Sequence, residues 1–152
     1  MKVFKLNKKQ KISKNISEVF DFFSKPENLS EITPKRLGFN IMTPSPIEMK
    51  EGQLIDYTIN ILSLPVRWTT IITKYAPPNL FIDQQLKGPY SMWHHTHTFE
   101  EIGMNETLIE DTILYAMPFG FIGDLAHFLY VKRDLENIFR YREETIKKVF
   151  NE

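Results

Sequence analysis

Over most of the chain, apolar and polar residues alternate one by one, in segments separated by proline, glycine and asparagine. In residues 54–61, for example, Ile55, Tyr57 and Ile59 share one parity and polar side chains occupy the other. Successive side chains of a strand point to opposite faces, so this pattern is typical of antiparallel strands with one covered and one wetted face. It predicts six strands, at residues 39–43, 54–61, 66–75, 80–86, 90–102 and 107–117. The short connections favour an antiparallel meander, because parallel strands need longer crossovers.

The first part of the chain predicts a further strand and two short helices. Residues 2–14 carry apolar side chains mainly on one parity and lysines mainly on the other, which is typical of a polar edge strand. Ser17 is expected to cap a short helix, and Pro26 is expected to open a second one. Pro34 disfavours helical geometry in the residue before it, so the second helix should end there.

In the last part of the chain, apolar residues recur at three- and four-residue intervals. This spacing predicts a long amphipathic helix that begins near residues 121–124. The apolar stripe consists of Ile122, Leu125, Leu129, Leu135, Ile138, Phe139, Ile146 and Val149. We expect the stripe to pack down on the sheet. No proline follows Pro118, so nothing in the sequence forces a kink. We expect His127 at the helix surface or at a cavity mouth. Together the elements predict one α+β domain over residues 1–152.

Composition and charge exclude several classes of partner. The 152 residues include 19 Lys or Arg and 19 Asp or Glu, so no net charge concentrates nucleic acid or holds the protein on an anionic membrane. The absence of cysteine excludes disulfides and thiolate chemistry and fits a reducing compartment. No apolar run approaches the roughly 20 residues that span a bilayer, and the first residues lack the apolar core of a signal peptide. We therefore expect a cytoplasmic protein with no nucleic-acid partner and no stable membrane insertion.

Candidate chemistry gathers in residues 93–97, which contain three of the four histidines. In a strand, Trp93, His95, His97 and Phe99 share one face. Residues 80–86 are apolar on both parities, and we take the face of Phe81, Asp83 and Gln85 as inward because it aligns a carboxylate with the histidines. The inward faces of all strands give the predicted ligand-binding residues Tyr57, Trp68, Phe81, Asp83, Gln85, Trp93, His95, His97, Phe99, Asp111 and Tyr115.

The histidines admit several interpretations. They can belong to a polar network that lines a pocket, because buried imidazoles and carboxylates satisfy one another. His95 or His97 can work with Asp83 or Asp111 in general acid and base catalysis. Two histidines and a carboxylate can also hold zinc or iron, but no spacing signature supports a third ligand, so we favour the network and predict no metal. Phosphate-loop, dinucleotide-binding and Gly-x-Ser-x-Gly motifs are absent, and no cofactor is predicted.

Several stretches of the chain resemble a known superfamily. Residues 16–29 (ISEVFDFFSKPENL) look like the opening signature of the START-like, or SRPBCC, superfamily. The stretches IDY (55–57), PPNLFIDQQ (77–85), GPY (88–90), WHHTH (93–97) and YAMPFG (115–120) are similar to an uncharacterised bacterial subfamily, which also occurs joined to nucleotide-sugar epimerase-like domains. The resemblance covers nearly the whole chain. It implies the helix-grip fold, in which a curved sheet of about seven antiparallel strands wraps a long C-terminal helix and two short helices follow the first strand.

The superfamily includes lipid carriers, hormone receptors, cyclases and hydrolases, so the fold does not by itself supply a function. It does imply a cavity between the concave face of the sheet and the long helix. We expect the protein to bind a hydrophobic or aromatic molecule there, of the lipid, isoprenoid or polyketide type. The alternative is a cofactor-free polyketide cyclase or dehydratase that uses a His/Asp pair, and a third hypothesis is a module that binds an epimerase-like partner domain. Catalysis and oligomeric state stay open at this point.

Overall fold

The computed structural model describes residues 1–151 as a seven-stranded antiparallel sheet wrapped on one side by helices. Its strands are β1 (Phe4–Ile12), β2 (Asn40–Ile41), β3 (Leu54–Ile61), β4 (Leu64–Ala76), β5 (Leu80–Lys87), β6 (Met92–Gly103) and β7 (Glu106–Ala116). They lie in the order β1-β7-β6-β5-β4-β3-β2, so β1 is the predicted edge strand. Every predicted strand is present, with ends within two residues of the prediction.

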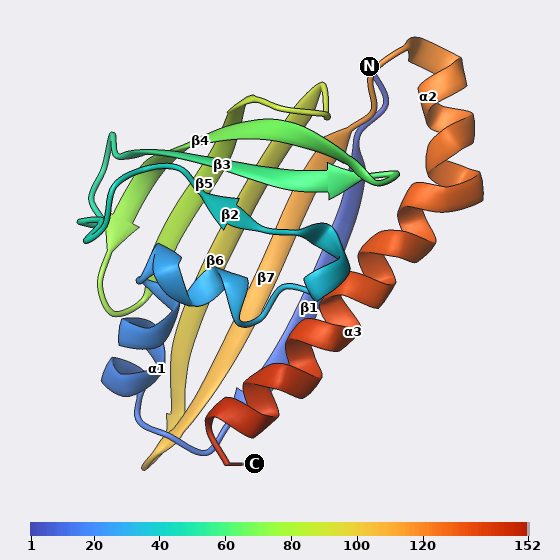
Figure 1. The fold of residues 1–152 in the computed structure, drawn as a ribbon. Helices are drawn as coiled ribbons and strands as arrows, with labels where there is room; N and C mark the ends of the chain where they lie inside the picture. The colour runs from blue at the N-terminus through green and yellow to red at the C-terminus, as the bar shows by residue number, and fades with distance from the viewer. Residues whose placement is uncertain (152) are drawn as a thin grey trace.

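The helices lie at the two ends of the concave side of the sheet (Figure 1). After β1 come α1 (Ile16–Phe23) and two 3-10 helices, η1 (Pro26–Ser30) and η2 (Lys35–Leu37). The C-terminal helix consists of α2 (Gly120–Ala126), a π-helical segment η3 (His127–Val131) and α3 (Lys132–Val149). This order confirms the predicted helix-grip architecture. Within the part of the chain that is described, no helix is long and apolar enough to cross a membrane.

The first helix starts two residues before the position expected from a cap at Ser17. Asn15 is the N-cap, and its side-chain oxygen accepts a hydrogen bond from the backbone N–H of Glu18 at 3.0 Å. Asparagine and serine are comparable caps, so the nearby Asn15 can take the role that the sequence assigned to Ser17. The prediction of a helix here is confirmed, and the prediction of its cap is wrong.

The C-terminal helix differs from the prediction in its first half. The five residues His127–Val131 form a π-helix, so the helix is not regular throughout although it contains no proline. Ile122, Leu125 and Leu129 are each more than half exposed, so this part of the apolar stripe does not pack on the sheet. The wider π turn shifts the phase of the stripe, and α2 projects beyond the body of the protein beside the N-terminus (Figure 1).

The second half of the helix packs as predicted. Leu135, Phe139 and Ile146 are buried against the concave face. Ile146 joins a cluster of buried residues with Phe20 from α1, whereas Leu135 and Phe139 join a second cluster with the two tryptophans. Residues of both clusters border one cavity on the concave side of the sheet.

Candidate functional site

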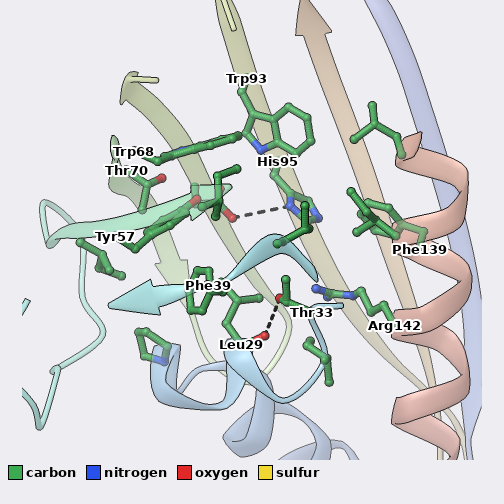
Figure 2. A pocket seen from close by; sticks show the side chains of 18 of the residues that line it. Leu29, Thr33, Phe39, Tyr57, Trp68, Thr70, Trp93, His95, Phe139 and Arg142 are labelled. Carbon is green, nitrogen blue, oxygen red and sulfur yellow. Dashed lines mark hydrogen bonds and ion pairs between the residues drawn. The ribbon is translucent and has the colours of Figure 1, made fainter. Parts of the chain in front are cut away.

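The concave face of the sheet and helix α3 enclose a cavity of about 390 Å³ (Figure 2). One wall is aromatic. Tyr57 on β3 and Trp68 on β4 are direct cross-strand neighbours, and their rings stack with centroids 5.7 Å apart. Trp93 on β6 meets Trp68 edge-on at 5.3 Å. Such a wall offers a large apolar surface to a ligand, as is usual for small-molecule sites.

The wall opposite the sheet comes from the helices. Leu29 and Thr33, at and after η1, and Phe139 and Arg142 of α3 line the cavity (Figure 2). The Thr33 hydroxyl donates to the Leu29 carbonyl oxygen at 2.6 Å, so this hydroxyl is already satisfied. Of these four residues, only Arg142 brings a charge to the cavity.

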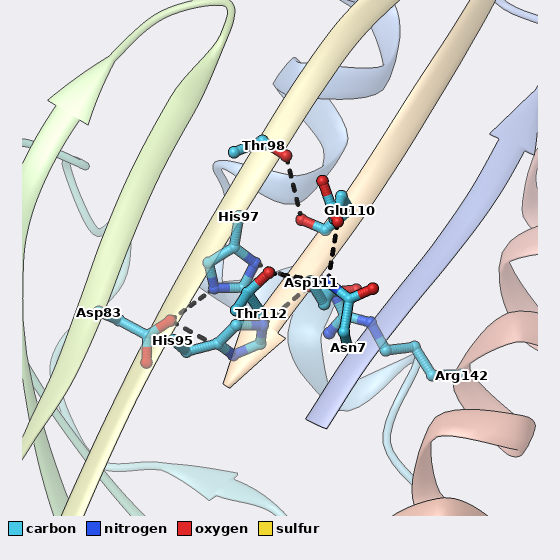
Figure 3. Close-up of polar contacts among 9 residues, drawn as sticks. All are labelled: Asn7, Asp83, His95, His97, Thr98, Glu110, Asp111, Thr112 and Arg142. Atoms are coloured by element: carbon cyan, nitrogen blue, oxygen red, sulfur yellow. Dashed lines mark hydrogen bonds and ion pairs between the residues drawn. The ribbon is translucent and has the colours of Figure 1, made fainter. Parts of the chain in front are cut away.

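Charged and polar side chains lie together at the floor of the cavity, where Asp83, His95, His97 and Arg142 line it and Asp111 lies behind them. Figure 3 shows their contacts. We call Asp83, His95, His97, Asp111 and Arg142 the charge network. Strand register explains the first four, because Asp83 on β5 pairs with His95 on β6, and His97 pairs with Asp111 on β7. Directly opposite residues on one face of a sheet lie within side-chain contact. The alternation of the strands therefore assembles this cluster from three separate segments.

The histidines and carboxylates of the charge network are tightly joined. Nε2 of His97 donates to Oδ2 of Asp83 at 2.6 Å, and Nε2 of His95 donates to Oδ1 of Asp111 at 2.8 Å. The two imidazole rings stack with centroids 3.6 Å apart. The other ring nitrogens face the opposite carboxylates, with His97 Nδ1 3.3 Å from Asp111 and His95 Nδ1 3.8 Å from Asp83. Each imidazole thus lies between two carboxylates.

The network lies between the cavity and a second, smaller groove. His95, His97 and Asp83 line the cavity, whereas Asp111 lines the groove between α3 and the strands β1 and β7. Arg142 lines both spaces, and its Nη2 donates to Oδ1 of Asp111 at 3.3 Å. The charged side chains therefore form a partition that is one layer thick.

Both carboxylates stay ionised in this setting. Burial alone raises the pKa of Asp111, but the Arg142 guanidinium and the hydrogen bonds from the histidines outweigh burial and hold that pKa well below its usual value. Burial also opposes ionisation of Asp83, and the hydrogen bond from His97 and the nearby cations bring its pKa below the usual value. The two negative charges require nearby positive charge.

The two histidines differ in their protonation. Burial lowers the pKa of both, but contacts with Asp111 and Asp83 outweigh burial at His97 and raise its pKa. At His95, burial and the adjacent charge of His97 prevail and lower the pKa. His97 is therefore the more basic of the two imidazoles. In the neutral form of His95, whose Nε2–H donates to Asp111, Nδ1 carries a free lone pair.

The same residues are the ones that could hold a metal. Ligand atoms of Asp83, His95 and His97 lie within 4.8 Å of one another. A cation at this point would have to replace the 2.6 Å hydrogen bond between His97 and Asp83. Hydrogen bonds within the network already engage Asp83 and Nε2 of both histidines, whereas Nδ1 of His97 has no hydrogen-bond partner among the described residues.

The structure brings together most of the ligand-binding residues that the sequence predicted. Seven of them line the cavity, namely Tyr57, Trp68, Phe81, Asp83, Trp93, His95 and His97. The inward orientation chosen for strand β5 is thus observed at Phe81 and Asp83.

Four predicted residues lie elsewhere. The Gln85 amide side chain exchanges hydrogen bonds with the Tyr90 backbone, at 2.8 and 3.2 Å, and so folds onto the turn before β6. Phe99 packs in the core beyond the cavity. Asp111 lies behind the histidines and supports them instead of facing the cavity. Tyr115 lies at the far side, where its hydroxyl hydrogen-bonds to His127.

His127 also departs from the prediction. It is only 5% exposed, its Nε2 lies 2.6 Å from the Tyr115 hydroxyl oxygen, and its ring stacks on Phe4 at 3.6 Å. The helical position suggested a surface residue, but the exposed side of the helix at this point is taken by apolar neighbours such as Phe128 and Leu129. The π turn gives a physical reason, because it rotates His127 toward β1 and β7.

Arg142 is the functional candidate that the sequence interpretation missed. It lies three residues after Phe139 and four before Ile146, and thus within the buried stripe of α3. A lone arginine inside an apolar helix stripe needs a buried counter-charge, and this signal was present in the sequence.

Comparison with known proteins supports the fold and does not identify the chain. No protein-family model matches the chain, and no curated protein matches it in sequence. A START superfamily protein from Mycobacterium smegmatis is similar in structure, with a TM-score of 0.71, 12% identity, and coverage of 95% of this chain and 98% of that one.

Two plant proteins are also similar in structure. Major latex-like protein 151 from Panax ginseng has a TM-score of 0.68 at 13% identity and covers 97% of each chain. Norcoclaurine synthase from Thalictrum flavum, solved with dopamine and hydroxybenzaldehyde, has a TM-score of 0.66 at 12% identity, and covers 96% of this chain and 87% of that one. These likenesses show that the chain has the START-like, helix-grip fold.

Proposed function

We propose that the protein binds a small hydrophobic or aromatic molecule, of the lipid, isoprenoid or polyketide type, in the cavity between the sheet and α3. The observation that carries this proposal is the cavity of about 390 Å³ with an aromatic wall of Tyr57, Trp68 and Trp93. Norcoclaurine synthase, which shares the fold, was solved with two small aromatic compounds, and this supports an aromatic ligand here.

Burial of an aromatic group in this space supplies enough free energy for binding. One ring system removes about 150–250 Å² from water, which at about 25 cal/mol per Å² corresponds to roughly 4–6 kcal/mol before the entropic cost of association. A ligand that spans the cavity with two such groups would bind in the micromolar range, at about 8 kcal/mol net. The polar floor then determines the orientation of the ligand.

Native mass spectrometry with a panel of fatty acids, isoprenoid alcohols and aromatic polyketides tests this proposal. The variant Ile59→Trp adds bulk to a partly exposed position on the cavity wall, and Thr58→Trp adds the same side chain on the other face of β3. We expect one ligand per protein with the wild type and with Thr58→Trp, and loss of the complex with Ile59→Trp. Binding that Ile59→Trp leaves unchanged, or a panel from which nothing binds, would contradict the proposal.

A specific feature also supports the second candidate, a cofactor-free cyclase or dehydratase. The free Nδ1 of His95 lies at the cavity floor, 3.8 Å from Asp83, and a neutral imidazole in a dry cavity can remove a proton from an enolisable substrate. His97, paired with Asp83 at 2.6 Å, would supply the adjacent positive charge. The candidate catalytic residues are thus His95 and His97, with Asp83 and Asp111 as positioning residues.

A matched pair of histidine variants tests this alternative. The change His95→Gln removes the free base nitrogen, whereas His94→Gln changes the neighbouring histidine on the other face of β6. With a linear aromatic polyketide as substrate, general-base catalysis predicts a loss of turnover of about 100-fold or more for His95→Gln and no loss for His94→Gln. Equal rates for wild type and His95→Gln would refute catalysis at this site.

The resemblance to the bacterial subfamily supports a finer proposal about the cellular setting. We propose a cytoplasmic location and an epimerase-like partner domain, with no nucleic-acid partner. The exposed apolar residues of α2 and η3, such as Phe121 and Phe128, offer a surface for such a domain. Co-purification with a purified epimerase-like domain, lost on Phe121→Ser and Phe128→Ser, would support this pairing. Elution as two separate species would contradict it.

A further inference from the structure

The guanidinium of Arg142 has fewer partners than its position requires. Arg142 is only 7% exposed, on the wall of the cavity. A guanidinium has five N–H donors, but the described residues supply one acceptor, Oδ1 of Asp111 at 3.3 Å, and Nε has no partner. Its remaining contacts are the rings of Phe23 and Phe139, with the guanidinium carbon 5.4 and 5.6 Å from their centroids. Arg142 can therefore accept a further hydrogen-bond partner from the cavity.

The charges of the network balance within the network itself. The carboxylates of Asp83 and Asp111, whose pKa values are lowered, face the guanidinium of Arg142 and the imidazole of His97, whose pKa is raised. His95 is neutral, and the lone pair of its Nδ1 is free. A buried network with no net charge tolerates a neutral ligand, whereas a charged ligand must bring or take up a compensating charge.

We infer that the cavity selects ligands that carry one anionic group, such as a carboxylate, which binds against Arg142 and His95, and that binding takes up one proton at Nδ1 of His95. This inference rests on the proposed ligand-binding function and adds the chemical class of the ligand. The carboxylate accepts hydrogen bonds from the guanidinium and from the newly protonated Nδ1, while the apolar body of the ligand occupies the aromatic part of the cavity.

The protonation step follows from the surroundings of His95. The groups that face it are Asp83 from β5, His97 from β6, Asp111 from β7 and Phe139 from α3. Arg142 of α3 donates to the same Asp111 oxygen, Oδ1, as His95 does. The two carboxylates are held ionised by their donors, and His97 and Arg142 already carry their protons. His95 is thus the member of the network that can gain a proton, and an anion beside it raises its pKa.

The unpartnered groups also favour an anion over a cation. The Asp83 and Asp111 carboxylates, which would attract a ligand amine, already accept hydrogen bonds from His97, His95 and Arg142. Arg142, by contrast, keeps unused donors at the cavity wall. Unsatisfied buried donors are matched by acceptor atoms of a ligand, and an arginine binds a carboxylate in a bidentate manner.

Three naphthalene probes of similar shape test the inference by isothermal titration calorimetry near neutral pH. Naphthalene-1-acetate carries a carboxylate, naphthalene-1-acetamide is its neutral counterpart, and 1-naphthylmethylamine is a cation. We expect the acetate to bind about tenfold or more tightly than the amide, because a hydrogen bond between two charged groups, here the carboxylate and Arg142, is stronger than one to a neutral amide. Titrations in two buffers of different ionisation enthalpy should show uptake of about one proton per acetate bound and of none per amide.

Arginine variants on one helix supply the control. Arg142→Gln should remove the preference for the acetate over the amide, while Arg140→Gln, on the exposed side of α3, should retain the preference. Arg142→Lys keeps the positive charge and should retain part of the preference for the acetate. This variant replaces Arg142→Gln as the test if Arg142→Gln does not fold. The wild-type comparison of the probes needs no variant at all.

The outcomes separate this inference from the function on which it rests. If acetate and amide bind equally well, or if the acetate binds without proton uptake, the inference is overturned and the ligand-binding function stands. Tighter binding of the amine also overturns it and assigns the site to cations through Asp83. If none of the probes binds, both the inference and the proposed function fail.

Discussion

Replacement of Asp111 by asparagine should destabilise the protein far more than a comparable change at the surface. Asp111 is buried, accepts a hydrogen bond from His95 at 2.8 Å and one from Arg142 at 3.3 Å, and lies 3.3 Å from Nδ1 of His97. Asp111→Asn keeps the shape and removes the charge. It leaves the two cations of the network with one carboxylate, Asp83, to balance them.

The magnitude follows from the cost of an uncompensated buried charge. Breaking a buried ion pair at one partner costs about 3–5 kcal/mol. The imidazolium of His97 can release its proton when Asp111 is neutral, so we expect the lower end, about 3 kcal/mol. With a urea m-value of about 2 kcal/mol per molar, the unfolding midpoint should fall by roughly 1.5 M.

Urea unfolding at neutral pH, followed by tryptophan fluorescence, measures this shift. Asp21→Asn is the matched control, because the Asp21 side chain is 67% exposed and its 2.9 Å pair with Lys25 is on the surface. Exposed pairs contribute less than about 1 kcal/mol, so the midpoint of this control should barely move. Equally small shifts of the urea midpoint for Asp111→Asn and Asp21→Asn would refute the claim that Asp111 balances the buried positive charges of the network.

Two further predictions concern pH and packing. The pKa of His97 is raised in the folded state, so its contribution to stability is complete below the unfolded-state pKa of about 6.5. That contribution is lost as the pH rises through the folded-state pKa. The urea midpoint of the wild type should therefore decline above pH 7, and the midpoint of His97→Gln should decline less steeply. A flat profile would contradict the charge assignment. Gly123→Ala places a Cβ 1.7 Å from the carbonyl oxygen of Pro118 and should lower the melting temperature by several degrees, while Gly103→Ala, whose Cβ meets only a side chain at 3.5 Å, should not. Equal melting temperatures for the two alanine variants would contradict the packing of α2.

The sequence predicted the sheet well, because strand periodicity is a local property. Alternation placed every strand and put Trp93, His95 and His97 on one face. Periodicity alone did not decide the inward face of strand β5, which carries apolar residues on both faces. Asp83 was placed beside the histidines because a buried carboxylate and an imidazole are natural partners. The cavity floor was thus largely readable from residue order.

The remaining features depend on interactions that periodicity does not encode. Gln85 shares the parity of Asp83, but its amide folds over the Gly88 turn, where a Cβ would lie 2.4 Å from the Gln85 side-chain oxygen. The π turn at His127 changes which side chains of the helix face the sheet. Arg142 was missed because the buried face of an amphipathic helix is assigned from its apolar residues, so a charged residue is assigned to the exposed face.

The most direct test of the account is a crystal structure of the protein with naphthalene-1-acetate. The account predicts the naphthalene rings within the aromatic part of the cavity, beside Trp68 and Trp93, and the carboxylate within hydrogen-bond distance of Arg142 and of Nδ1 of His95. A cavity filled by its own side chains, or a probe bound only at the surface, would contradict the central claim that this space binds a small molecule.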